Sequence, residues 1–223
     1  MSMTITARAS IALLLAAAFF VLATVGGPSS PLDTAVAEWF GQVRADLPAA
    51  VQYAEALTAI GGAPVTLGLS LIAAIWLFAK RMRGRALLLA ATVLLQRLAV
   101  ELMKDAFGRP RPAVEHLPSS LAFPSGHAAN SMATYLAIAI IAVPDRYRRP
   151  AVLTAVAVTF VVGLTRLILG VHWASDVVGG WTLGLLAAGL AVTIGERSGA
   201  LRLEAQHDVV AGHGLPAGED ETA

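Results

Sequence analysis

Two histidines, His127 and His172, are the side chains of this sequence best suited to acid–base or nucleophilic chemistry. Asp176 follows His172 by four positions, so the two side chains share a face wherever the chain is helical. The carboxylate could hold one ring nitrogen as N–H, which leaves the other nitrogen free to attack an electrophile. His127 directly follows Pro124-Ser125-Gly126 and could protonate a leaving alkoxide. The pattern therefore indicates a nucleophile, a group that orients it and a general acid.

Three cationic side chains, Lys104, Arg111 and Arg166, lie in the same segments and have few acidic neighbours. Arginine presents a planar fork that suits phosphate oxygens, and lysine adds a point charge. Ser125 and Gly126 stand where a helix is expected to begin, and the free backbone N–H groups of a helix start bind anions. Together with the histidines, these residues predict a site for phosphoryl transfer.

The elements that must position this site are apolar helices. Hydrophobic residues make up 57% of the chain and charged residues 14%, whereas soluble proteins carry about 25% charged residues. Six segments approach the roughly 20 mostly apolar residues that a membrane span needs: about 9–26, 56–79, 86–104, 126–143, 150–169 and 176–195. The sequence predicts an all-α, six-transmembrane helix bundle as one domain over 1–195, followed by a disordered cytoplasmic tail over 196–223.

Basic residues predict the side of the membrane on which each loop lies. The loop 80–85 and the segment 146–149 carry the excess of Lys and Arg that is typical of cytoplasmic loops. Both termini are then cytoplasmic, and all three site segments lie on the extracytoplasmic face of a cell membrane. The first apolar segment is interpreted as a retained helix rather than a signal peptide, since it lacks a clear cleavage site. The segment 27–50 is compatible equally with an interfacial amphipathic helix and with an ordinary loop.

Three motifs carry a family resemblance. Residues 104–112 match K-x6-R-P, residues 124–127 match P-S-G-H, and residues 166–176 match R-x5-H-x3-D. Together they resemble the type 2 phosphatidic acid phosphatase superfamily, which includes lipid phosphate phosphatases, undecaprenyl-diphosphate phosphatases and vanadium haloperoxidases. The family usually has Ser where this chain has Thr165, which is also a hydroxyl residue. The resemblance implies His172 as nucleophile, Asp176 as its partner, His127 as general acid, and Lys104, Arg111, Ser125, Gly126 and Arg166 as phosphate ligands, with no metal or other cofactor.

The implied activity is hydrolysis of a lipid phosphate or diphosphate through a vanadate-sensitive phosphohistidine intermediate. Undecaprenyl diphosphate, phosphatidylglycerol phosphate, phosphatidate and a decaprenyl-phosphoryl sugar precursor all remain open as substrates. The expected partners are this lipid substrate and the lipids of the membrane; a net charge of +1 does not suggest nucleic acid. An anion or lipid transporter without hydrolytic activity is the alternative. A metal-dependent hydrolase is disfavoured, because the three cations would repel a divalent ion.

Three further charged residues have two interpretations each. Arg97 and Glu101 stand at i and i+4 of the third apolar segment. They are predicted either to form a structural ion pair that faces the bundle interior, or to position Lys104 without contacting the ligand themselves. Arg109 is compatible equally with a site residue and with a plain interfacial flank whose charge reaches toward lipid headgroups.

Overall fold

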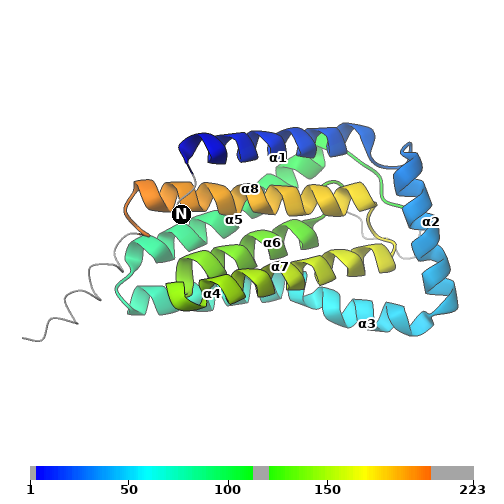
Figure 1. Ribbon diagram of the computed structural model, residues 1–223. Coiled ribbons are helices and arrows are strands. Elements are labelled where there is room, and N and C mark those ends of the chain that lie inside the picture. Colours follow the sequence, from blue (N-terminus) through cyan, green and yellow to red (C-terminus); the bar gives the residue numbers. More distant parts are fainter. Residues whose placement is uncertain (1–3, 113–120, 202–223) are drawn as a thin grey trace, which may run out of the picture.

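The structure is a computed structural model that describes residues 4–112 and 121–201. The described chain is mostly helical, which confirms the predicted all-α class. The helices are α1 (Ile5–Val25), α2 (Pro31–Asp46), α3 (Pro48–Thr58), α4 (Ala63–Ala79), α5 (Arg83–Phe107), α6 (Gly126–Ala137), α7 (Asp145–Ile168) and α8 (Ala174–Arg197). A 3-10 turn (Ala59–Gly61) links α3 to α4, and a π-helical turn (Ile138–Ala142) extends α6. Figure 1 shows the long helices side by side, with α2 lying across one end.

Five segments of the described chain are long and apolar enough to cross a membrane: Thr6–Val25, Pro48–Ala79, Arg83–Phe107, Asp145–Ile168 and Ala174–Arg197. The remaining predicted segment, 126–143, is not among them, because α6 has 12 residues and its π-helical extension five. Nine of those 12 residues are buried, since α6 packs against α5, α7 and α8 at the centre of the bundle. Such a short buried helix is characteristic of a protein core, and the six-span count stays a prediction.

The segment 27–50 is mostly helical, so the interpretation as an ordinary loop is wrong. The side chain of Ser30 accepts a hydrogen bond from the N–H of Asp33, and Pro31 occupies the first turn of α2, as is common at helix starts. Phe40 is buried whereas Trp39 is exposed, so α2 presents one aromatic ring inward and one outward.

The C-terminal part of the described chain remains folded beyond the predicted domain boundary at 195. Helix α8 continues to Arg197, and Leu201 packs against the apolar cluster around Leu77 and Leu89. Arg8 at the start of α1 forms an ion pair with Glu196. The rest of the predicted tail, residues 202–223, lies outside the described residues.

The two ends of the bundle differ in which helices begin and finish there. We call the end where α5 and α7 finish and α6 and α8 begin the site end, and the opposite end the far end. Helix α2 crosses the site end, while the start of α1 and the finish of α8 lie at the far end (Figure 1). The three motifs of the sequence all fall at the site end.

Candidate active site

His172 lies in the short connection between α7 and α8 and is only 4% exposed. Gly170, with a φ of 68°, makes the left-handed turn that brings the chain back toward α8. The Nδ1 atom of His172 is 3.4 Å from Oδ2 of Asp176, and Nε2 is 3.1 Å from Nη1 of Arg111. One ring nitrogen therefore faces a carboxylate and the other faces a cation.

Asp176 stands in the first turn of α8 and is completely buried. Its Oδ2 accepts a hydrogen bond of 2.8 Å from the N–H of Trp173, so the carboxylate also caps the helix. Its backbone oxygen accepts a hydrogen bond of 2.9 Å from the N–H of Ser125. A Cβ atom at Gly180 would lie 2.6 Å from the backbone oxygen of Ser125, so only glycine lets α8 approach the start of α6 this closely.

The start of α6 offers hydrogen-bond donors that have no partner in the described chain. Ser125 precedes the helix, is completely buried, and its Oγ has no hydrogen-bond partner. The first backbone N–H groups of a helix also lack acceptors within the helix. Nζ of Lys104 is 3.7 Å from the position that a Cβ of Gly126 would take, so the ammonium group lies against this helix start. The arrangement is suited to binding an anion.

Arg166 lies in the last turn of α7 and is 7% exposed. Its Nη1 donates a hydrogen bond of 2.8 Å to Oγ1 of Thr58, whereas its buried Nε has no partner. Burial, followed by the positive charges of Arg111, Arg166 and Lys104, lowers the pKa of His172 well below its ordinary value of about 6.5. His172 is therefore neutral at pH 7, the form that can act as a nucleophile.

His127 shares this electrostatic environment. The charges of Arg166, Lys104 and Arg111 act on His127, as does His172. The structure therefore brings together all eight residues that the three motifs singled out, within one cluster at the site end.

Arg109, for which the sequence left two interpretations open, is buried beside Asp176. It is 6% exposed, and its Nη1 donates hydrogen bonds of 2.7 Å to Oδ1 of Asp176 and 2.8 Å to Oγ of Ser175. The interpretation as an interfacial flank is wrong, and the doubled Arg-Pro of residues 109–112 is the signal that could have singled Arg109 out. Nothing in the sequence marks Asp33 or Ser175, which also join this cluster.

The predicted pair Arg97 and Glu101 is divided between two partners. Oε1 of Glu101 accepts a hydrogen bond of 3.3 Å from Nζ of Lys104, and Nη1 of Arg97 donates one of 3.3 Å to Oγ1 of Thr66 on α4. No ion pair joins Arg97 to Glu101 in the described part of the chain, so the ion-pair interpretation is wrong. The contact of Glu101 with Lys104 fits the other interpretation, which stays a prediction.

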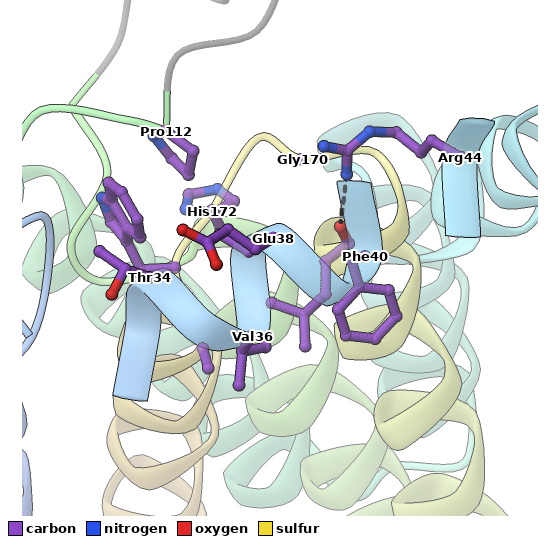
Figure 2. Close-up of a pocket in the computed structure, with 12 residues that line it drawn as sticks. Thr34, Val36, Glu38, Phe40, Arg44, Pro112, Gly170 and His172 are labelled. Carbon is purple, nitrogen blue, oxygen red and sulfur yellow. Dashed lines mark hydrogen bonds between the residues drawn. The ribbon is translucent and has the colours of Figure 1, made fainter. Parts of the chain in front are cut away.

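A cavity of about 260 Å³ lies between α2 and the connection that carries His172 (Figure 2). Phe40 and Glu38 line it from α2, and His172 and Trp173 line it from the opposite side. Arg44 closes one edge by donating hydrogen bonds of 3.3 and 3.1 Å to the last carbonyl groups of α7. The imidazole of His172 thus borders a space of mostly apolar lining with a few polar side chains.

The chain matches the model of the PAP2 superfamily over residues 85–200, and it therefore belongs to this superfamily. It is 32% identical over 137 residues to phosphatidylglycerophosphatase B of Bacillus subtilis (strain 168), a match that covers 58% of this chain and 68% of that protein. It also resembles a transmembrane PAP2-type phosphatidylglycerolphosphate phosphatase from Bacillus subtilis, known from a crystal structure. That likeness has a TM-score of 0.75 and 27% identity, and it covers 83% of this chain and 96% of that one.

Proposed function

We propose that this protein is a membrane phosphatase that removes phosphate from a lipid through a phosphohistidine intermediate on His172. The observation that carries the proposal is a set of buried, unpartnered groups around one imidazole. Oγ of Ser125 and Nε of Arg166 are both buried without a hydrogen-bond partner in the described chain. Unpaired buried polar groups cost about 1–3 kcal/mol each, so their concentration beside a nucleophile supports a bound phosphate as their missing partner.

The first chemical step is attack on phosphorus by the lone pair of Nε2 of His172. A P–N bond forms as the P–O bond to the lipid breaks, and the leaving oxygen takes a proton from His127. Lys104, Arg111 and Arg166, with the backbone N–H groups at the start of α6, compensate the charge on the phosphoryl oxygens. The dianionic phosphate also favours the protonated form of His127 that this step needs.

The second step returns the enzyme to its starting state. His127, now neutral, takes a proton from a water molecule that attacks phosphorus, and the P–N bond breaks to release inorganic phosphate. Asp176 stabilises the positive charge that the ring of His172 acquires while phosphorus is attached. Its two hydrogen bonds, from Trp173 and Arg109, hold the carboxylate in place during both steps.

A lipid is the substrate that suits the position of this site. The reactive imidazole lies at the end of a bundle with five candidate membrane spans, so a lipid can keep its tails in the bilayer while its headgroup reaches the cations. The cavity beside His172 offers space for the rest of the headgroup, with Thr34 and Glu38 as polar contacts. Both similar proteins are named for phosphatidylglycerol phosphate, so this lipid is the first substrate to test.

The site is proposed to face the extracytoplasmic side of the cell membrane, with both termini in the cytoplasm. The basic loop 80–85 and the segment 146–149 lie at the far end, as do the described chain termini (Figure 1). An excess of Lys and Arg at one end is typical of the cytoplasmic side. In this arrangement α6 is the sixth helix of the membrane domain, and the other helices enclose it.

Phosphate release by the purified protein in detergent tests the proposal. The substrates are phosphatidylglycerol phosphate, phosphatidate, undecaprenyl diphosphate and soluble glycerol phosphate, each assayed with the wild-type protein and with His172→Ala. We expect release from at least one lipid, little from glycerol phosphate, inhibition by millimolar vanadate, and a radiolabelled, alkali-stable adduct in the wild-type protein alone. Activity should survive chelator, since no three His, Asp or Glu side chains of the described residues are grouped to hold a metal. Anion or lipid uptake into vesicles without any phosphate release would instead favour the transporter.

A further inference from the structure

Arg109 contacts Oδ1 of Asp176, whereas His172 lies against the other carboxylate oxygen, Oδ2. Nη1 contacts Asp176 and Ser175, and Nη2 donates hydrogen bonds of 2.6 and 2.7 Å to the backbone oxygens of Leu22 and Ala23 at the end of α1. The guanidinium also lies over the ring of Phe123, 4.4 Å from its centroid. With its donors engaged in this way, Arg109 holds Asp176 and does not reach a phosphate.

Asp33 of α2 approaches the same cluster from the N-terminal part of the chain and is 2% exposed. Its Oδ1 accepts a hydrogen bond of 2.9 Å from the N–H of Ser175, and its Oδ2 accepts hydrogen bonds from Oγ of Ser175 and from the N–H of Gly27. All of these partners donate, so the side chain is bound as a carboxylate. Through the hydroxyl of Ser175, which also accepts from Arg109, Asp33 is linked to Asp176.

The turn between α1 and α2 is shaped to fit this cluster. A Cβ atom at Gly26 would lie 2.1 Å from Oγ of Ser175, which is far too close for any side chain. Gly27 has a φ of 100°, and a Cβ there would lie 3.1 Å from Cδ of Arg109. The turn therefore allows hydrogen bonds to join Asp33, Ser175, Arg109 and Asp176, and Oδ2 of Asp176 lies 3.4 Å from Nδ1 of His172.

We propose that Asp33, Ser175 and Arg109 are positioning residues that fix Asp176 against His172 and preserve its negative charge during catalysis. Arg109 alone would compensate the carboxylate of Asp176 and weaken its attraction for a positively charged imidazole. Asp33 supplies a second carboxylate, so the cluster carries one more negative than positive charge. That excess is available to the ring of His172 when it gains positive charge on attacking phosphorus.

The proposal rests on the proposed phosphatase function and extends it to a part of the chain that the motifs do not reach. Asp33 and the end of α1 lie outside residues 85–200, where the family model matches. The N-terminal helices thus complete the surroundings of the catalytic pair, in addition to any role in the membrane.

The test compares Asp33→Asn and Ser175→Ala with Asp46→Asn, a matched control at the exposed end of the same helix α2. We expect kcat to fall about 10- to 100-fold in the first two variants, the range seen when groups that hold a catalytic ligand are removed. KM and the inhibition constant for vanadate should change less than about threefold, because the phosphate ligands are untouched. Asp46→Asn should behave as the wild type. Thermal unfolding identifies variants that lose activity only because they are unstable. Ser175→Ala keeps the backbone N–H that donates to Oδ1 of Asp33, so it removes only the hydroxyl.

A double-mutant cycle separates positioning from a general structural role. In the Asp176→Asn background, followed with radiolabelled lipid, Asp33→Asn should cause no further loss of kcat, since its route to His172 is already interrupted. The inference would be overturned if the losses of kcat caused by Asp33→Asn and Asp176→Asn multiplied in the double variant. It would also be overturned if Asp33→Asn and Ser175→Ala both kept the kcat of the wild type. In either case the phosphatase proposal would stand. A wild-type protein that releases no phosphate from any lipid would overturn the phosphatase function first, and with it this inference.

Discussion

The two ends of the bundle both hold arginine side chains that are shielded from solvent, but these arginines have different surroundings. At the far end, Arg85 is 3% exposed and donates hydrogen bonds of 3.1, 3.4 and 3.4 Å to the backbone oxygens of Ala200, Ile141 and Leu201. Ile141 lies at the end of the π-helical turn, and Ala200 and Leu201 lie in the turn that follows α8. Carbonyl groups at the ends of helices lack partners within the helix. Arg85 thus closes the helix ends and has a structural role.

At the site end, Arg166 is buried almost as deeply, yet its Nε has no partner in the described chain. The cluster at the site end also holds Lys104, whose described partner is the exposed Glu101, and an unpartnered hydroxyl at Ser125. The comparison teaches that burial alone does not identify a functional arginine. Arg85, which satisfies chain carbonyls, stabilises the fold, whereas Arg166, with an unused donor in the cluster around His172, is suited to an anionic ligand.

The largest expected effect comes from removing the reactive group of the site end. His172→Ala should lower kcat by roughly four orders of magnitude or more, because it removes the group proposed to accept the phosphoryl group. The fold should persist, since Asp176 keeps its hydrogen bonds from Trp173 and Arg109 when the ring is removed. Phosphate release measures kcat, and size-exclusion chromatography in detergent shows whether the fold persists. Activity near that of the wild type would show that the nucleophile is another residue.

The next largest effect is a loss of activity that is expected for Arg166 but not for Arg85. Arg166→Gln should lower kcat/KM about 10²- to 10³-fold, the range for removing one donor that stabilises transition-state charge. Its stability should change by less than about 1 kcal/mol, because a buried donor without a partner is removed along with the contact to Thr58. Steady-state kinetics and thermal unfolding test both parts. A large loss of stability with normal kinetics would make Arg166 a structural residue like Arg85.

The converse effect is expected at the far end. Arg85→Gln leaves up to three carbonyl acceptors without their donor and should lower the free energy of unfolding by about 2 kcal/mol. The kcat of the molecules that remain folded should stay within about twofold of the wild type, since the reactive groups lie at the other end of the bundle. The melting temperature and activity per folded molecule provide the measurement. An unchanged melting temperature would mean that the carbonyl contacts of Arg85 contribute little.

The sequence predicted which residues lie together at one end of the bundle better than it predicted the framework around them. Lys104, Arg111, His127 and His172 lie within a few residues of helix ends, so correct apolar segments were enough to bring them to one end. The helix α6 was harder, because a buried helix and a membrane span both appear as an apolar run. Arg97 and Glu101 show another limit: spacing predicts which residues share a helix face, but partners on other elements decide the contacts, as Thr66 does for Arg97.

Asp33 shows what a sequence does not contain. Its position after Ser30 and Pro31 is that of an ordinary first-turn residue, and its contact with Ser175 joins residues 142 positions apart. Such long-range polar contacts depend on the path of the turn at residues 26 and 27, which the sequence indicates only as a Gly-Gly pair. Charge compensation around a catalytic pair therefore requires the three-dimensional structure, whereas the identity of the pair does not.

The smallest expected effect concerns the protonation of His172, and it compares the two ends directly. Burial and the cations of the site end disfavour the imidazolium, so the pKa of His172 lies well below about 6.5. The ring is neutral at pH 7 and remains so as the pH falls to 6, whereas an ordinary histidine would bind a proton over this interval. The unfolded chain does bind that proton, so acidification below about 6.5 also lowers the stability of the folded state.

Carbon-13 NMR of labelled histidines in detergent, with the signal assigned by its loss in His172→Ala, measures this protonation in the free enzyme. Arg166→Gln removes one of the charges that act on the ring and should raise the pKa of His172 toward 6.5. Arg85→Gln should leave it unchanged, because carbonyl-bound Arg85 lies at the far end and is not among the groups that act on His172. Equal shifts in the two variants, or a wild-type titration at 6.5, would contradict the view that an unneutralised positive charge is concentrated at the site end.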